Sequence, residues 1–237
     1  VSGYNMGLIE NCRSYAPQSA ITDYVGGITG FNTGTLRGCY NAGALTLGRV
    51  YAGGIAGANT GRIELCQNDA DVTGSAFNAF ITSKTQNAIG GIAGGTNTDA
   101  SVIISCLNQG TVTGARQVGG IIGVCNQSVL RGNINTGMVN CWLTDPTQGA
   151  MAGNLTRLEG ENNFFDGSVV VAGAALSSGR PGFTSLSTAE LTSGKAPASL
   201  PDADKWTFAA TPIPCSRHSP TNPWPWPPPQ PWPTSAR

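Results

Sequence analysis

A Gly-Gly-Ile box recurs four times along this chain of 237 residues. The boxes begin at Gly26, Gly53, Gly90 and Gly119. The steps between them are therefore 27, 37 and 29 residues. Self-similarity at such a period is the signature of a solenoid, in which each unit buries its apolar face against its neighbours. The repeat thus limits the chain to folds built from stacked, similar units.

Cysteine and asparagine positions keep step with the boxes. Cys39 and Cys66 each follow the first glycine of their box by 13 residues, and Cys12 begins the series without a box. Cys106 holds this position in the third unit, and asparagine replaces cysteine later, at Asn133 and Asn163. Two residues beyond Cys39, Cys66, Cys106 and Asn133 stand further asparagines, namely Asn41, Asn68, Asn108 and Asn135. Three further columns are Ile28, Ile55, Ile92, Ile121; Asn32, Asn59, Asn97, Asn126; and Thr46, Thr73, Thr113.

Short apolar runs alternate with Gly and Asn inside each unit, and no helical period of 3.6 residues persists. We therefore predict an all-β fold, a parallel β-helix of about five coils with about three short strands per coil. Ile, Val and Cys should point inward, while asparagine ladders at the corners bond each other and the turn backbone. Glycine is expected where φ is positive or where backbones approach closely. The change to Asn133 and Asn163 predicts that the solenoid loses register toward its C-terminal end.

Three regions are expected along the chain. Residues 1–176 should form the solenoid, and residues 177–214 a small C-terminal cap. A capping box from Ser187 to Glu190 predicts one short helix over about residues 188–194 within this cap. Residues 215–237 form a tail rich in Pro and Trp, which we expect to be extended or disordered. Because the series begins in mid-repeat, we also expect the chain to be part of a longer protein.

Two units carry a resemblance to a known family. They read GGITGFNTGTLRGCYNAGALT and GGIAGANTGRIELCQNDADVT. These units resemble GLUG-motif repeats, which occur in bacterial surface and secreted proteins, including filamentous adhesins and immunoglobulin A-cleaving metallopeptidases. The resemblance covers roughly residues 4–166 and implies an extracellular or cell-surface location. It also implies a stalk, adhesive or recognition module, with any peptidase chemistry in a separate domain.

Composition argues against several partners and cofactors. The net charge is zero and charged residues make up 11% of the chain, so no basic surface for nucleic acid is expected. No window of 18 apolar residues predicts membrane insertion. The single histidine, His218, lies in the tail, and the cysteine spacings match no zinc pattern. We therefore predict no metal and no cofactor.

The cysteines are expected to be reduced. Side chains stacked in parallel strands point the same way, which does not favour disulfides along the column of Cys12, Cys39, Cys66 and Cys106. These four are predicted to be small buried apolar residues. Cys125 and Cys141 lie outside the column, and a disulfide between them stays open, as does the state of Cys215.

Catalysis and ice binding are both weakly supported. Polysaccharide-degrading β-helices need clustered carboxylates. Asp69 and Asp71 share a face near Glu64, but the neighbouring coils offer no second layer of carboxylates. We therefore favour a solvated turn and predict no catalytic residues and no enzyme. The threonine column could order water, but ice-binding solenoids usually carry two such columns, and this chain has one.

Two insertions give the best indication of a binding surface. The segments before the third box and after the fourth box lengthen, at about residues 75–88 and 141–148. Insertions of this kind leave a solenoid at one corner and tend to mark its binding face. The predicted ligand-binding residues are Phe77, Phe80, Lys84, Trp142 and Asp145. In the alternative interpretation, Phe77 and Phe80 fold back as a lid on the solenoid.

The sequence therefore favours a non-enzymatic structural and adhesive segment of a bacterial cell-surface or secreted protein. Its partners would be a host glycan or protein, or other surface proteins. The alternative is a recognition or stalk module of a large secreted hydrolase, acting on peptides or polysaccharides, whose catalytic domain lies outside this chain. A peptidase zinc motif elsewhere in a longer sequence would favour the hydrolase, and further repeats with a wall anchor would favour the adhesin.

Overall fold

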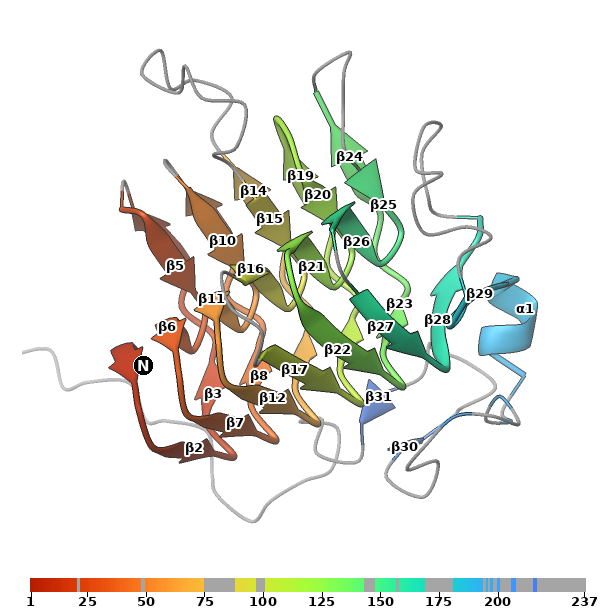
Figure 1. Cartoon of the computed structure of the whole chain (residues 1–237), viewed down its shortest axis with the longest axis horizontal. Helices are drawn as coiled ribbons and strands as arrows, with labels where there is room; N and C mark the ends of the chain where they lie inside the picture. Colours follow the sequence, from red (N-terminus) through yellow and green to blue (C-terminus); the bar gives the residue numbers. More distant parts are fainter. Residues whose placement is uncertain are drawn as a thin grey trace, which may run out of the picture.

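The chain folds as a parallel β-solenoid in the computed structural model (Figure 1). The structure describes residues 1–20, 22–47, 50–74, 88–96, 101–142, 148–156, 158–168, 181–193, 195, 197, 200, 206–207 and 215–216. The chain passes in order through five parallel sheets, here named A to E. Within the described residues it completes five such coils, and β26–β28 begin a sixth. This confirms the predicted all-β parallel β-helix of about five coils.

The strands are short, mostly two to four residues each. Sheet A contains β1 (Ser2–Asn5), β6 (Thr29–Asn32), β11 (Ala56–Asn59), β16 (Ala93–Thr96), β21 (Ile122–Cys125) and β26 (Ala152–Leu155). Sheet B contains β2 (Leu8–Glu10), β7 (Thr35–Arg37), β12 (Arg62–Glu64), β17 (Ser101–Ile104), β22 (Ser128–Arg131) and β27 (Leu158–Glu161). Sheet C contains β3 (Arg13–Ser14), β8 (Tyr40–Asn41), β13 (Gln67–Asn68), β18 (Leu107–Asn108), β23 (Ile134–Asn135), β28 (Asn163–Asp166) and β29 (Phe183–Leu186).

The two remaining sheets of the solenoid lie on the side of the insertions. Sheet D contains β4 (Gln18–Ala20), β9 (Leu45–Leu47), β14 (Val72–Gly74), β19 (Val112–Gly114) and β24 (Val139–Cys141). Sheet E contains β5 (Tyr24–Gly26), β10 (Tyr51–Gly53), β15 (Ala88–Gly90), β20 (Val118–Gly119) and β25 (Gln148–Gly149). A separate antiparallel pair is formed by β30 (Trp206–Thr207) and β31 (Cys215–Ser216).

Each complete coil has five strands, so the prediction of three strands per coil was wrong. One extra corner, between sheets B and C, repeats in every coil as a residue with positive φ just before the cysteine column. These residues are Asn11, Gly38, Leu65, Ser105, Gly132 and Asn162, with φ between 52° and 64°. Because Leu and Ser rarely adopt this conformation, sequence patterns give little sign of the bend at Leu65 and Ser105.

The box glycines are required for close packing. None of them is among the glycines with positive φ, so backbone conformation is not the reason for glycine at these positions. A Cβ atom at Gly27 would lie 2.4 Å from the carbonyl oxygen of Gly54 and 2.5 Å from Cγ of Asn41. A Cβ atom at Gly26 would lie 2.3 Å from the carbonyl oxygen of Thr29. Only glycine fits where the coil narrows between sheets E and A.

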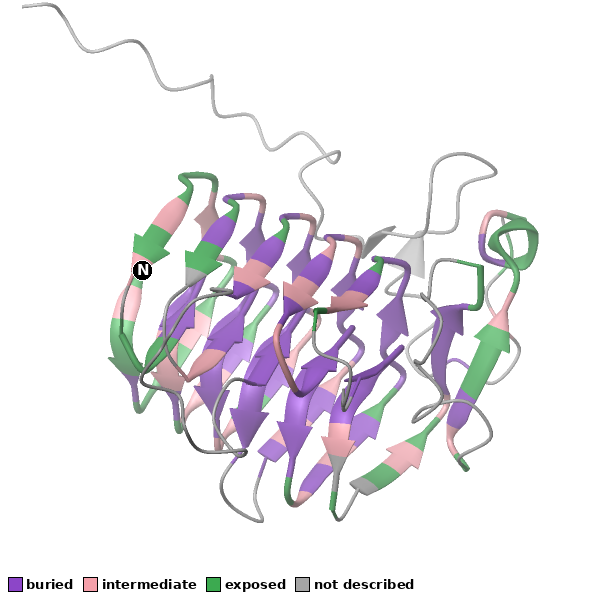
Figure 2. Cartoon of the chain, turned by 90° about the horizontal axis from the view of Figure 1, so that it is seen from above, coloured by how far each residue is buried: buried purple, intermediate pink, exposed green. Residues whose placement is uncertain are grey.

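This narrowing divides the interior into two apolar cores, and Figure 2 shows the buried residues running along the stack. The larger core contains the four box isoleucines, which are fully buried as predicted, and Cys39, Cys66 and Cys106. Cys12 packs against this core but is only partly buried, so the prediction that it is buried was wrong, because it lies in the first coil of the stack. The smaller core lies between sheets D and E, with residues such as Val72 and Val112. Between the cores run Asn41, Asn68, Asn108 and Asn135, all fully buried.

These asparagines form a continuous ladder in the interior. The Nδ2 of each donates to the Oδ1 of the next, at 2.8 Å from Asn41 to Asn68, 2.9 Å from Asn68 to Asn108 and 2.8 Å from Asn108 to Asn135. The last Nδ2 donates to the carbonyl oxygen of Ala150 at 2.8 Å. Each amide also bonds the adjacent turn, as Asn41 does with the Gly43 carbonyl oxygen at 3.1 Å. The ladder thus satisfies buried polar groups at the narrowest part of each coil.

The second asparagine column is shorter than the sequence suggests. Asn5, Asn32 and Asn59 form a ladder, with Nδ2–Oδ1 distances of 2.7 Å in both steps. In the next coils Thr96 and Cys125 take this register. Asn126 is exposed one position later, and Asn97 lies outside the described residues. The Nδ2 of Asn59 instead donates to Oγ of Ser101, at 2.8 Å. The predicted placement of Asn126 in the ladder was therefore wrong.

The solenoid keeps its register where asparagine replaces cysteine, so the expected loss of register was also wrong. β23 pairs in parallel with β28, and β22 pairs with β27. The backbone N–H of Cys106 donates to Oδ1 of Asn133 at 3.0 Å. In the cysteine part of the column, the backbone N–H of Cys39 donates to Sγ of Cys66 at 3.4 Å. Asparagine therefore takes over the acceptor role of the thiol.

The C-terminal cap covers one side of the solenoid. β29 extends sheet C, and α1 (Thr188–Leu191) follows with Ser187 as its N-cap and the predicted capping box. Leu191 and Leu200 pack with outward-facing residues of sheet C, namely Leu107, Ile134 and Phe164. The helix ends at Leu191, three residues before the expected end. No described helix is long and apolar enough to cross a membrane.

Candidate functional site

The corner that joins sheets D and E carries the insertions. Residues 75–87 follow β14 and residues 143–147 follow β24, and both chain segments next enter sheet E. Phe77, Phe80, Lys84 and Asp145 lie outside the described residues. Trp142 is described directly after β24, where its backbone N–H donates to the Gly114 carbonyl oxygen at 2.9 Å. Trp142 is 44% exposed. Of the five predicted ligand-binding residues, it is the one that the structure describes, and it lies at the surface.

A row of aromatic rings runs along sheets A and E in the first two coils. The rings of Tyr4 and Phe31 stack with centroids 5.3 Å apart, and those of Tyr24 and Tyr51 with centroids 5.6 Å apart. An edge-to-face contact between Tyr24 and Phe31 links the two pairs. Tyr4 is 54% exposed and Tyr24 38% exposed. The sequence patterns do not predict this row, although the two members of each stacked pair are 27 residues apart, one repeat period.

The candidate carboxylates Asp69 and Asp71 accept hydrogen bonds within and between the coils. Asp69 accepts from the Tyr40 hydroxyl at 2.9 Å and from Nε2 of Gln67 at 2.7 Å. Burial and the bond to Asp69 raise the pKa of Tyr40 well above its usual value, so this phenol stays protonated. Asp71 accepts from the backbone N–H of Thr111 at 2.9 Å. Each carboxylate therefore bonds its own coil or a neighbouring one.

Glu64 is held by two arginines. Burial alone would raise its pKa, but hydrogen bonds from Arg37 and Arg62 outweigh this effect, and the pKa is lowered. Glu64 is therefore ionised and cannot act as a general acid near neutral pH. Among the described residues, no group of three His, Cys, Asp or Glu side chains could hold a metal ion.

The threonine column lies on sheet D, where Thr46, Thr73 and Thr113 pair in register. Thr46 is exposed, whereas the other two are partly buried. Asn140 follows Thr113 in the next coil. The row is thus short and single, which gives it little resemblance to a flat water-ordering surface.

Six cysteines of the solenoid form no disulfide: Cys12, Cys39, Cys66, Cys106, Cys125 and Cys141. The open question of a Cys125–Cys141 disulfide is thereby answered, since neither is bridged. Burial raises the pKa of Cys125 to about 11 and that of Cys66 well above its usual value. Such thiols are neutral at pH 7 and are poor nucleophiles or metal ligands.

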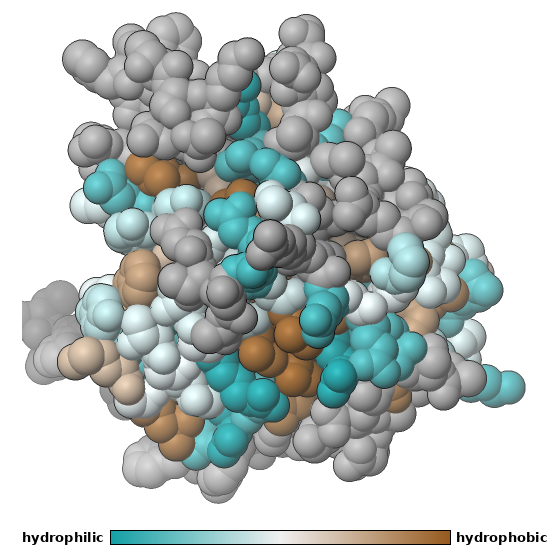
Figure 3. Space-filling model, in the orientation of Figure 1, coloured by the Kyte–Doolittle hydropathy of each residue, from teal (hydrophilic) through white to brown (hydrophobic). Residues whose placement is uncertain are grey.

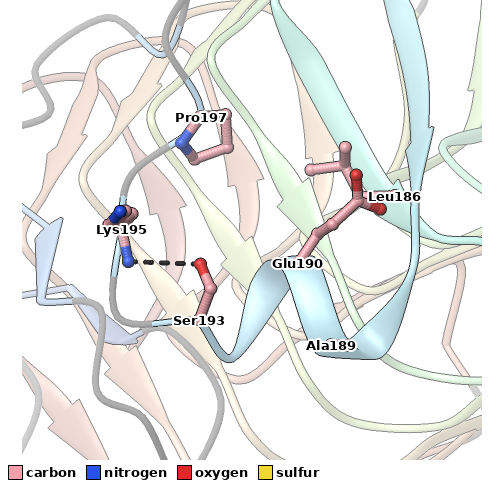
Figure 4. Close-up of a pocket in the computed structure, with 6 residues that line it drawn as sticks. All are labelled: Leu186, Ala189, Glu190, Ser193, Lys195 and Pro197. Atoms are coloured by element: carbon pink, nitrogen blue, oxygen red, sulfur yellow. Dashed lines mark hydrogen bonds between the residues drawn. The ribbon is translucent and has the colours of Figure 1, made fainter.

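A cavity of about 370 Å³ lies beside α1 (Figure 4). Its lining residues are Leu186, Ala189, Glu190, Ser193, Lys195 and Pro197. Hydrogen bonds from the backbone N–H and hydroxyl of Ser187 lower the pKa of Glu190. This carboxylate is therefore ionised and held by the helix cap, which leaves it unsuited to proton transfer.

Comparison with known proteins identifies no relative of this chain. No protein-family model, curated protein or solved structure matches the chain. The resemblance to GLUG-motif repeats thus depends on the repeat residues themselves. Of the surfaces described above, the insertion corner with Trp142 best fits a binding role, because this aromatic residue is exposed and directly precedes the insertion of residues 143–147.

Proposed function

We propose that this chain is a non-enzymatic β-solenoid segment that acts as a stiff spacer and an adhesive module in a bacterial cell-surface or secreted protein. The asparagine ladder supports the spacer role, because it ties each coil to the next through buried hydrogen bonds. Five coils at about 4.8 Å each give a rod of about 24 Å. The resemblance to GLUG-motif repeats supports the surface or secreted location.

The exposure of Trp142 at the insertion corner carries the adhesive role. Exposed aromatic rings stack on sugar rings and anchor protein partners. Host glycans and host proteins are therefore the proposed ligands. The chain would bind these ligands at one edge of the rod, while the ladders keep that edge straight.

A binding screen with one matched pair of variants tests this role. The full chain is applied to immobilised host glycans and host proteins, and Trp142→Ala is compared with Met138→Ala. Met138 is a good control because it is 43% exposed and lies just before β24. We expect Trp142→Ala to weaken binding tenfold or more, as loss of an anchor residue does. Equal binding by both variants would contradict the proposal.

A further inference from the structure

The outer face of sheet B changes character in the fourth and fifth coils. Strand alternation turns Val102 and Ile104 of β17 and Val129 of β22 outward, and all three are partly exposed. The inward residues Ile103 and Leu130 are fully buried. At the two outward positions the neighbouring strand β12 carries Arg and Glu, and β27 carries two Glu. The three apolar side chains therefore form an island in a charged face.

Figure 3 shows this island as a brown area over β17 and β22 with teal areas on both sides. On one side Glu64 pairs with Arg37 and Arg62. On the other side Arg131 pairs with Glu161 at 2.8 Å. An apolar centre with a charged rim is the usual anatomy of a protein interface.

On the neighbouring sheet C, similar outward-facing apolar residues are covered by the cap. The outward Leu107, Ile134 and Phe164 are buried beneath Leu191 and Leu200 of the cap. Val102, Ile104 and Val129 belong to none of the hydrophobic clusters that the described residues form. The apolar island of sheet B thus has no equivalent cover among the described parts of the chain.

One row across the face is self-complementary. In register from coil to coil it reads Arg62, Val102, Val129, Glu159. Glu159 is exposed and makes no ion pair with another described residue. Consider a two-fold axis that relates two copies, runs parallel to the strands and passes between β17 and β22. It would place Arg62 of each copy opposite Glu159 of the other copy. Such mutual contacts define an isologous interface.

We propose that the outer face of sheet B binds a second copy of this chain. Arg62 then lies opposite Glu159 of the second copy, and Val102 lies opposite Val129. Ile104 packs against the aliphatic part of the opposite Arg131. Glu64 and Glu161 also meet across the axis, but each is already neutralised by arginine. The two rods would lie side by side with antiparallel axes, whichever ligand binds the insertion corner.

The expected dimer is weak. A stable interface buries about 800 Å² on each partner, and an island of three side chains is far smaller. We therefore expect a dissociation constant on the order of 0.1–1 mM in dilute solution. Pairing of this strength would matter where many copies are crowded together, as on a surface.

Sedimentation equilibrium of the full chain over a wide concentration range tests the proposal by charge exchange. We expect Arg62→Glu alone and Glu159→Arg alone each to weaken dimerisation tenfold or more, because like charges then meet at both ends of the row. The double variant Arg62→Glu/Glu159→Arg should restore it, because the opposite charges are exchanged. Arg116→Glu, in the turn between β19 and β20, controls for the change in net charge and should dimerise like the unaltered chain. Circular dichroism of each variant checks that the fold is intact.

Two results would overturn the proposal. One is a chain that stays monomeric at millimolar concentration. The other is a dimer that both single variants leave unchanged, since that dimer must use another surface. Val102→Thr/Val129→Thr provides a second measurement that does not depend on charge. The variant keeps the side-chain size but places hydroxyl groups at the centre of the island, so it should weaken dimerisation, and an unchanged dissociation constant would also count against the proposal.

Discussion

One column of the solenoid has a cysteine part and an asparagine part, and the two parts provide the same hydrogen-bond acceptor with different side chains. From Cys12 to Cys106 the position is filled by a thiol, and at Asn133 and Asn163 by an amide. In both parts the side chain accepts a backbone N–H from the preceding coil, at 3.4 Å for Sγ of Cys66 and 3.0 Å for Oδ1 of Asn133. The position therefore requires a small side chain with an acceptor, and apolar character alone does not suffice.

The amide part makes more bonds than the thiol part. Nδ2 of Asn133 donates to the carbonyl oxygen of Ile103 at 2.9 Å and contacts Oδ1 of Asn163 at 2.9 Å. The thiol of Cys106 has longer contacts, at 3.3 Å to the Ile104 carbonyl oxygen and 3.8 Å to that of Ile63. Thiols are weak donors and acceptors. Removal of the acceptor should therefore cost more in the asparagine part.

The largest effect is expected for Asn133→Leu. This variant keeps the volume but removes the acceptor of the Cys106 N–H and the amide that donates to the Ile103 carbonyl oxygen, in a fully buried site. Each such group costs about 1–3 kcal/mol, so the free energy of unfolding should fall by about 3 kcal/mol. Urea unfolding measures it. Asn133→Cys is the control and should lose less than half as much, and equal losses would show that the acceptor is unimportant.

A smaller effect is expected for Cys66→Ala. The Cys39 N–H loses its acceptor and a small cavity opens in the larger core, so the free energy of unfolding should fall by about 2 kcal/mol. Cys66→Asn should be milder, because the amide replaces the thiol as it does naturally at Asn133. If Cys66→Asn proves worse than Cys66→Ala in urea unfolding, the two parts of the column are not equivalent.

Most structural features that recur with the repeat period could be predicted from the sequence. The box isoleucines, the interior asparagines and the capping box at Ser187 all recur or stand in recognisable patterns. The bends at Leu65 and Ser105 could not be predicted, because stacking holds these residues in a conformation that they rarely choose. The error at Asn126 arose from counting residues across an irregular turn, where the ladder register passes to Thr96 and Cys125.

The sequence also held a usable sign of where the cap packs. The outward position of sheet C changes from Gln67 to Leu107, Ile134 and Phe164, which indicates a covered face. Of the candidate binding residues, the structure describes Trp142, and the aromatic row was missed because its members lie on two different strands of the coil. The insertions carry no repeat, so their residues could be proposed only from length and composition.

Alkaline pH should destabilise the fold through its buried thiols, both in the column and outside it. Burial raises the pKa of Cys66 and brings that of Cys125 to about 11, so the folded state holds these protons more tightly than the unfolded state. The resulting stability is fully present below the unfolded thiol pKa of about 8.5 and is lost as pH rises toward 11. The thermal midpoint should therefore fall between pH 8 and 10.5. A variant with Cys66→Asn and Cys125→Ser should fall less, and an identical fall would contradict the assignment to thiols.

The smallest effect concerns the corner before the column. Leu65 has φ of 55°, a conformation that costs a branched side chain about 1 kcal/mol, whereas asparagine occupies the same corner at Asn11 and Asn162. Leu65→Asn should raise the free energy of unfolding by about 0.5 kcal/mol, after some loss of apolar contact. Gln109→Asn, in a turn of sheet C without positive φ, serves as the control. Destabilisation by Leu65→Asn would show that leucine packing outweighs the strain.

Hydrogen exchange at one backbone amide tests the central claim most directly. The Cys106 amide bonds the Asn133 side chain, while the adjacent Leu107 amide bonds the Cys66 carbonyl oxygen and serves as an internal reference. We predict that Asn133→Cys keeps the exchange rates of the two amides in the ratio seen in the unaltered chain. Asn133→Leu should speed exchange at Cys106 relative to Leu107 by roughly tenfold, the equivalent of about 1.4 kcal/mol. An unchanged ratio in Asn133→Leu would contradict the claim that thiol and amide are interchangeable acceptors in one continuous column.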